Sequence, residues 1–160
     1  MTDHECMAAA LAEARAAAAD GEVPVGAVVV KGNEIIARAG NRTVRDQDPT
    51  AHAEALALRA ASRVTGSWWL AGCTLYATLE PCAMCAGALV LARVDRVVFG
   101  AWDDKAGMAG SVGDLLRHPR LNHRPEVLGG FEGGESAALL RDFFARRRAS
   151  SFVDTPEPAS

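Results

Sequence analysis

The chain has 160 residues, a formal net charge of -3 and 49% hydrophobic residues, and a single domain of this size buries roughly 70% of its unfolded surface. Its four cysteines are too few for a secreted disulfide scaffold, and the opening MTDHECMAAA lacks the basic start and apolar run of a signal peptide. No apolar stretch approaches the about 18 residues that a membrane span needs. These totals predict one cytoplasmic domain without a membrane partner, and the negative net charge by itself disfavours nucleic acid as a ligand.

The first third of the chain predicts a helix, a β-hairpin and a second helix. Residues 5–19 carry small and apolar side chains at helical spacing, and Asp20 and Gly21 then end the pattern. PVGAVVV and EIIARAG flank Gly32 and Asn33, which is typical of a hairpin turn. AHAEALALRAAS consists of strong helix formers.

The rest of the chain alternates strands with helices. CTLYATL predicts a buried strand, CAMCAGALVLAR a helix and DRVVFG another strand, an order that favours an α/β sandwich with a parallel portion in its sheet. Residues 101–125 are long, polar and rich in Gly and Pro, which favours a functional loop. A short strand is expected at 126–128 and a last helix in ESAALLRDFFARRR. We expect residues 1–149 to form one domain and residues 150–160 a disordered tail.

The segment TLEPCAMCAGA holds the two cysteines of a C-x-x-C pair, which can form a disulfide, a redox dithiol or half of a metal site. Pro81 follows a strand and precedes helix formers, so it is expected at the first helical position. Cys82 and Cys85 then lie in the first turn, where a helix N-terminus stabilises thiolates. Three residues apart, the two side chains share a face and can bind one ion.

A second motif supplies the further ligand that a metal site needs. DPTAHAEALAL places His52 and Glu54 at the start of a helix, with Thr50 or Asp48 available as the N-cap. His52 with the two cysteines makes three N/S ligands, the number that a catalytic zinc keeps while its fourth position stays open. Glu54 is about 200° from His52 around an ideal helix. It is therefore better placed as a general acid and base than as a ligand.

H-x-E together with P-C-x-x-C is the signature of zinc-dependent deaminases. HAE and TLEPCAMCAGA resemble the cytidine-deaminase-like superfamily, and further segments are similar to the bacterial tRNA-specific adenosine deaminases: EVPVGAVVV, GNRT, DPTAHAE, FGAWDDKAGMAGS, LNHR and LLRDFFARRR. The resemblance implies a three-layer α/β/α sandwich on a mixed sheet of about five strands, a homodimer, and one Zn²⁺ per subunit on His52, Cys82 and Cys85. It also implies that Glu54 is the catalytic residue and that the wobble adenosine in a tRNA anticodon stem-loop is converted to inosine. No Gly-rich phosphate cradle is present, so no nucleotide cofactor is expected.

The same resemblance implies the residues that contact the substrate. By this likeness Asn41 hydrogen-bonds the target nucleoside, and Pro24, Val25 and Ala53 line its pocket. Asp103 and Lys105 are implied to approach the target nucleotide and its neighbours, although WDDK on its own is typical of a solvated turn. A carboxylate at Asp103 can accept from a ribose 2′-OH, which distinguishes RNA from DNA.

The basic and aromatic residues near the C-terminus are candidates for further RNA contacts. They alternate with acidic residues, so the sequence leaves open whether they form a basic surface or an ordinary solvated face. The phenylalanine among them is either a stacking platform or part of the core. The candidates are Arg117, His123, Arg124, Phe143, Arg146 and Arg147.

Two other functions remain compatible with the zinc motif. The first is deamination of a free base or nucleoside, such as guanine or cytosine, which uses the same zinc chemistry. The second is a structural zinc module or an inactive deaminase-like binding protein. Such a module needs a fourth protein ligand, for which Cys73, His118 or His123 are the candidates.

Overall fold

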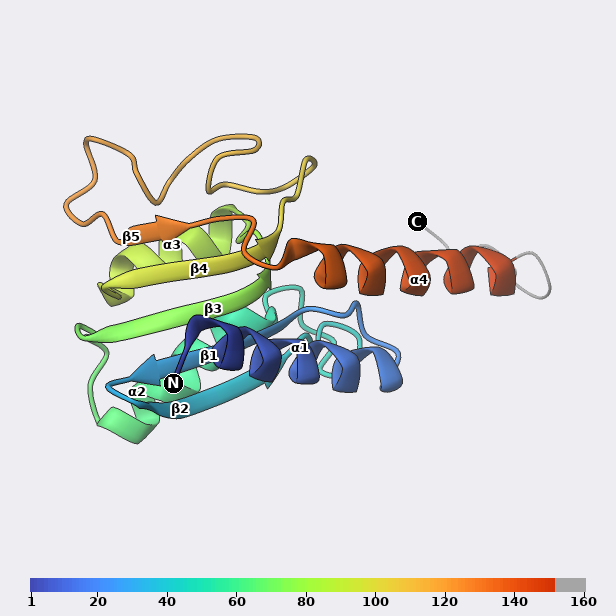
Figure 1. Cartoon of the computed structure of the whole chain (residues 1–160), viewed down its shortest axis with the longest axis horizontal. Helices are drawn as coiled ribbons and strands as arrows, with labels where there is room; N and C mark the ends of the chain where they lie inside the picture. The colour runs from blue at the N-terminus through green and yellow to red at the C-terminus, as the bar shows by residue number, and fades with distance from the viewer. Residues whose placement is uncertain (152–160) are drawn as a thin grey trace.

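The computed structural model describes residues 1–151, and within this range helices and strands alternate around one sheet (Figure 1). The predicted order of elements is confirmed, with ends that shift by a few residues. In chain order the elements are α1 Asp3–Ala19, β1 Gly26–Lys31, β2 Glu34–Gly40, α2 Ala53–Thr65, β3 Cys73–Leu79, α3 Ala83–Ala92, β4 Arg96–Ala101, β5 Glu126–Leu128 and α4 Gly133–Ser151.

The five strands form a mixed sheet in the order β2-β1-β3-β4-β5. β1 is antiparallel to both β2 and β3, whereas β3, β4 and β5 are parallel. The predicted hairpin joins β1 to β2, and its turn contains Gly32 at a φ of 62°, a value that glycine adopts without strain. The sheet is therefore mixed, as the resemblance implied.

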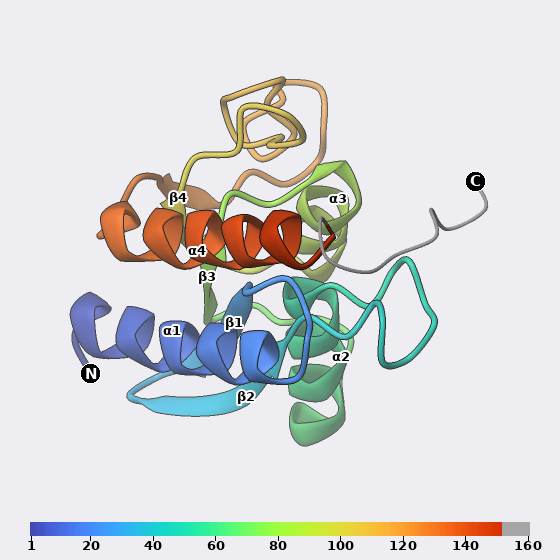
Figure 2. The same cartoon turned by 90° about the vertical axis from the view of Figure 1, so that its right-hand side faces the viewer.

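Helices cover both faces of the sheet, which confirms the three-layer α/β/α sandwich (Figure 2). α2 and α3 pack on one face, where the core includes Leu58, Leu89 and Phe99. α1 packs on the other face over a second core that includes Met7 and Val98, and α4 lies beside it. Each fully buried Leu, Phe or Met side chain stabilises the fold by about 1.5–3 kcal/mol.

α1 packs closely on its face of the sheet because two glycines leave room for it. A Cβ at Gly26 would collide with the backbone of Ala10, and one at Gly40 would lie 2.9 Å from the carbonyl oxygen of Glu13. The helix starts two residues before the predicted position, at a capping box in which Thr2 and Glu5 bind each other's backbone N–H. Within residues 1–151, no helix is both long enough and apolar enough to cross a bilayer.

α4 begins against the end of β4 and projects beyond the sheet (Figure 1). Its inner side chains Leu139 and Leu140 pack on the cores, whereas Phe144 is 42% exposed. The helix continues through Ser151, two residues into the segment 150–160 where the sequence predicted a disordered tail. The remaining residues of that segment lie outside the part of the chain that the structure describes.

Candidate metal centre and active site

One edge of the sheet gathers all the segments that carry the predicted site. β3 and β4 end side by side at Leu79 and Ala101, a paired position of the parallel ladder. β1 starts and β2 ends at the same edge, where Gly26 pairs with Gly40, because β1 is antiparallel to both of its neighbours. The N-termini of α2 and α3 also lie here, since each helix follows a segment that leaves this edge. Segments that are far apart in the sequence, from the start of β1 to the end of β4, thus meet in space.

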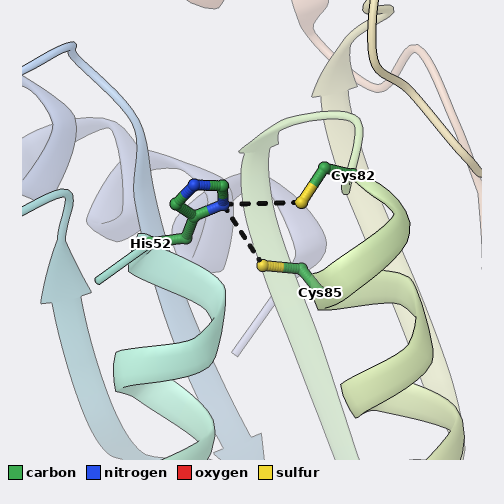
Figure 3. A group of neighbouring side chains, drawn as sticks. All are labelled: His52, Cys82 and Cys85. Atoms are coloured by element: carbon green, nitrogen blue, oxygen red, sulfur yellow. Dashed lines mark hydrogen bonds between the residues drawn. The ribbon is translucent and has the colours of Figure 1, made fainter. Parts of the chain in front are cut away.

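The predicted metal ligands are brought together at the two helix N-termini (Figure 3). Nδ1 of His52 lies 3.4 Å from Sγ of Cys82 and 3.6 Å from Sγ of Cys85. All three donor atoms lie within 4.8 Å of one another. They form the only group of three or more such donors among residues 1–151.

The two helix starts differ in detail from the sequence-based expectation. Cys82 is itself the N-cap of α3, in an extended conformation, so Pro81 precedes the cap and is not the first helical residue. His52 is likewise the N-cap of α2, which excludes Thr50 and Asp48 from that role. Asp48 instead accepts hydrogen bonds from the N–H and hydroxyl of Thr50. His52 and Cys82 therefore lie just outside their helices, whereas Cys85 lies in the first turn of α3.

The arrangement fits a tetrahedral zinc ion. Zn–S and Zn–N bonds of about 2.3 and 2.1 Å at tetrahedral angles place S and N about 3.6 Å apart. The observed separations of 3.4 and 3.6 Å match this edge length. Two sulfurs and one imidazole nitrogen are also the donors that zinc prefers.

The candidate fourth ligands lie elsewhere or are occupied. Cys73 is buried at the start of β3, at the far end of the strand from the site. Nε2 of His123 binds the carbonyl oxygen of Val94 at 2.7 Å, and Nδ1 of His118 accepts from the N–H of Arg120. With three protein ligands in the described residues, the group matches an open catalytic site more closely than a closed structural one.

The ligand cluster is electrostatically prepared for a cation. Hydrogen bonds from Cys85 and His52 outweigh burial and lower the pKa of Cys82 to about 3. The hydrogen bond to Cys82, together with burial, raises the pKa of Cys85. The hydrogen bond to Cys82 also raises the pKa of His52. Without a metal, protons on Cys85 and His52 thus stabilise the Cys82 thiolate. A bound metal ion would replace these protons.

Glu54 lies beside the ligands without belonging to their group. It is 4% exposed and sits in the first turn of α2, near Cys85. Burial raises its pKa to about 6. A carboxyl group with a pKa near the operating pH both accepts and donates protons efficiently, so Glu54 is suited to acid and base catalysis.

The predicted pocket residues meet around the starts of β1 and α2. Asn41 is 9% exposed, and its backbone N–H donates to the carbonyl oxygen of Val25 at 3.1 Å. Pro24 and Ala53 are both buried beside these segments. Ala53 directly follows the ligand His52, and Asn41 directly follows β2, so this group lies at the same sheet edge as the metal ligands.

Asp103 and Lys105 lie at the start of the loop that follows β4. Asp103 Oδ1 accepts from the N–H groups of Lys105 and Ala106, so this carboxylate forms a tight turn. Lys105 is exposed and lines a groove of about 600 Å³ together with side chains of α4. The structure thus places the predicted loop residues between the metal-binding turn and the last helix.

Two buried carboxylates that the sequence analysis did not single out hold the loops at this edge. Glu80 accepts hydrogen bonds from the backbone of Asp103, Ala109 and Ser111. Burial raises the pKa of Glu80, but its hydrogen bonds lower it by more. Glu22 accepts from the N–H groups of Val44 and Arg45 in the other loop. The only signal in the sequence is a glutamate near a buried strand. This pattern is too common to mark Glu80 or Glu22 as a residue that holds a loop.

The predicted RNA contacts separate into two groups. Arg117, His123 and Arg124 are bound within their own loop or to Val94. Phe143, Arg146 and Arg147 line a groove of about 650 Å³ between α1 and α4. The guanidinium of Arg147 lies 5.4 Å from the ring centroid of Phe143, so this aromatic side chain is partly covered by a cation.

The chain is similar to known deaminases along most of its length. The MafB19-like deaminase family matches residues 1–148. A tRNA-specific adenosine deaminase of Bacillus subtilis is 49% identical over 149 residues, which cover 92% of each chain. A solved structure of a tRNA:A34 deaminase acting at the wobble position is 44% identical with a TM-score of 0.83, and the match covers 86% of this chain and 99% of that one. A guanine deaminase of Nitrosomonas europaea is 28% identical with a TM-score of 0.76, and the match covers 90% and 85% of the two chains.

Proposed function

Because the chain belongs to the MafB19-like deaminase family and matches tRNA-specific adenosine deaminases over nearly their full length, we infer that it is a tRNA adenosine deaminase. It hydrolyses the wobble adenosine, position 34 of tRNA, to inosine and releases ammonia. The observation that carries this function is the 49% identity to a relative of that name over 92% of both chains. The His52, Cys82 and Cys85 group is the matching chemical feature. As finer proposals, the domain comprises residues 1–149, and the substrate is the arginine tRNA with an ACG anticodon.

We propose that His52, Cys82 and Cys85 hold one Zn²⁺ per subunit. When bound, zinc supplies Lewis-acid activation of water at near-neutral pH. The protein contributes the two helix N-termini that bring the donors together: the start of α2 holds His52, and the start of α3 holds the two cysteines. No fourth donor belongs to this group within residues 1–151, so a zinc ion held there would keep one coordination position available to water.

Glu54 carries the protons of the reaction. Water attacks the adenine carbon that bears the amino group, and a carboxylate oxygen of Glu54 takes a proton from this water. Glu54 then gives this proton to the adjacent ring nitrogen. The new hydroxyl on the ring carbon loses the second water proton, which Glu54 passes to the amine as the C–N bond breaks, so water and adenosine yield inosine and ammonia. Its burial and its pKa of about 6 suit one carboxyl group to both roles.

The target base is held by the residues around Asn41. The Asn41 amide hydrogen-bonds the nucleoside, while Pro24, Val25 and Ala53 form the wall of the pocket. These buried groups are presented by rigid strand and helix ends, which is how a preorganised site positions a flipped-out base. Asp103 and Lys105 contact the target nucleotide and its neighbours from the loop after β4.

The experiment compares RNA with small molecules. The purified protein is incubated with an unmodified tRNA transcript that carries adenosine 34, and in parallel with guanine, cytosine and adenosine. Inosine in the tRNA, lost in Glu54→Ala with zinc content unchanged, is the expected result. Ammonia from a free base alone would instead assign the guanine or cytosine deaminase function, and no turnover by a protein with four-ligand zinc would assign a structural module.

The proposed assembly is a cytoplasmic homodimer that uses the outer face of α2 and α3. This face carries a groove of about 450 Å³ lined by apolar side chains, among them Leu58, Met84 and Leu91. Trp68 is 67% exposed and borders the same groove. Large exposed apolar side chains gathered in one patch are typical of a subunit interface. Light scattering on the purified protein and on Leu91→Glu measures whether this face holds two copies together.

A further inference from the structure

A buried glutamate joins the metal-binding turn to the loop that carries Asp103 and Lys105. Glu80 is 2% exposed and lies two residues before Cys82, between β3 and α3. Its backbone N–H donates to the carbonyl oxygen of Ala101 at 2.8 Å, which ties the residue to the end of β4. The side chain therefore starts from the same rigid edge that positions the metal ligands.

The Glu80 carboxylate accepts four hydrogen bonds from one stretch of the loop. Oε1 accepts from the N–H of Asp103 at 2.9 Å and from the hydroxyl of Ser111. Oε2 accepts from the N–H groups of Ala109 and Ser111, both at 3.0 Å. A carboxylate offers about four acceptor sites, so this group is saturated. Only an ionised carboxylate can accept all four hydrogen bonds. In a glutamine, the NH₂ group would replace one oxygen and would face two of these N–H and O–H donors.

Gly107 allows the loop to close over this carboxylate. A Cβ at Gly107 would collide with the carboxylate atoms of Glu80. The neighbouring Met108 N–H donates to the carbonyl oxygen of Pro81 at 2.8 Å, and the Gly107 N–H donates to that of Asp103. Residues 103–111 thus wrap around one side chain and are also tied to the residue before Cys82. Any displacement of Glu80 would move Asp103 relative to the metal-binding turn.

We propose that Glu80 is a positioning residue for substrate recognition, which fixes Asp103 and Lys105 relative to the metal ligands by holding residues 103–111 on one carboxylate. The proposal rests on the proposed function, because the two loop residues matter in this way only for an enzyme that binds an RNA nucleotide. Binding groups are effective when they are held to within about 0.5 Å of the productive geometry. No hydrogen bond in residues 1–151 joins Glu54 or the three ligands directly to residues 103–111. Loss of the Glu80 contacts should therefore weaken substrate binding more than the chemical step.

The test replaces Glu80 by glutamine, which keeps the volume and removes the second acceptor oxygen. In Glu80→Gln, we expect faster backbone hydrogen exchange in residues 103–111 and a KM for anticodon stem-loop RNA raised about tenfold, with kcat within about threefold. The zinc content of the variant should equal that of the unmodified protein. Ser111→Ala removes one of the four bonds and should raise KM less, and the double variant should show a less than additive effect. Glu34→Gln, an exposed carboxylate in the β1–β2 hairpin, is the matched control.

Several outcomes would overturn the proposal. One is an unchanged KM although residues 103–111 exchange faster, and another is a fall in kcat that parallels a loss of zinc. If Glu80→Gln does not fold, Ser111→Ala and Gly107→Ala decide, because the first removes a donor and the second displaces the carboxylate. An unchanged KM in both would exclude the positioning role. Failure of the unmodified protein to deaminate tRNA would refute the proposed function before any variant is compared, while the exchange measurement would still decide whether Glu80 orders the loop.

Discussion

The two carboxylate oxygens of Asp103 have different environments, and this difference makes its role testable. Oδ1 accepts from the backbone N–H groups of Lys105 and Ala106 at 3.0 and 3.2 Å. Oδ2 accepts no hydrogen bond from the described residues, and the side chain is half-buried at the loop surface. One oxygen thus holds the turn, while the other is available to a ligand. A ribose 2′-OH can donate to this oxygen, and RNA carries this hydroxyl whereas DNA lacks it.

Asp103→Asn should weaken the preference for RNA over DNA. The asparagine oxygen can keep the turn, whereas its NH₂ group replaces the acceptor Oδ2. Because a hydrogen bond to a charged acceptor is worth roughly 1.5–3 kcal/mol, the ratio of kcat/KM on matched RNA and DNA hairpins should fall about tenfold or more. Asp104→Asn, the exposed neighbour, is the control. An unchanged ratio would remove Asp103 from RNA discrimination.

At the level of elements, the sequence predicted every helix and strand of residues 1–151 because each has strong local signals. The hairpin around Gly32 and the helix formers after His52 are examples. Helix starts were less predictable: Cys82 and His52 are N-caps because convergence on one point holds them extended, with ψ of 177° and 147°. Local propensity cannot predict which of several neighbouring residues is the N-cap when a contact between two helices determines it.

The docking of α1 depends on contacts that no local pattern reveals. Asp3, in its first turn, accepts two hydrogen bonds from the Arg96 guanidinium on β4 at 2.8 and 2.9 Å. It also accepts from the hydroxyl of Tyr76 on β3 at 2.6 Å. The hydrogen bonds from Arg96 and Tyr76 hold the pKa of Asp3 below its usual value. These partners are 93 and 73 residues away in the sequence, so only the folded chain brings them together.

Asp3→Asn should lower stability at neutral pH and lose its effect in acid. A carboxyl group whose pKa is lowered by folding stabilises the native state above the unfolded pKa, and this contribution disappears as pH falls through the folded pKa. The variant should therefore be less stable by about 1 kcal/mol at pH near 7, since the site is partly exposed. The difference should shrink below pH about 4. Urea unfolding of both proteins across this range measures it, with Glu34→Gln as the control. A difference independent of pH would show that the Asp3 charge does not contribute.

At the scale of the molecule, the site is an assembly of loops on one sheet edge, and its parts were not equally predictable. The group of His52, Cys82 and Cys85 was predictable because zinc chemistry determines its residue types and spacing. Glu80 was not, because its partners are backbone N–H groups 23 to 31 residues away, and any residue type supplies those. Arg117 and His123 remain candidates for RNA contact. The fold also engages them with Asp114 and Val94, partners that the sequence did not reveal.

Several exposed basic residues lie on α4, which projects past the site edge (Figure 1). Arg146 and Arg147 are exposed and line the groove between α1 and α4, while Lys105 lines the groove on the other side of the helix. A helix with cations along both flanks, next to the site, can follow the phosphates of an anticodon stem-loop although the net charge of the chain is negative.

Replacing Arg146 and Arg147 by alanine should weaken RNA binding without changing the chemical step. Each lost phosphate contact reduces the slope of log affinity against log salt by about 0.7–0.9, so the double variant should show a slope smaller by about 1.5. KM for the tRNA should rise, most strongly at low salt, while kcat stays close to that of the unmodified enzyme.

Because Arg147 also covers Phe143, the charge-conserving pair Arg146→Lys and Arg147→Lys separates the phosphate contact from packing. Arg38→Ala, an exposed arginine on β2, is the control. An unchanged salt slope in the alanine variant would exclude Arg146 and Arg147 from the RNA interface.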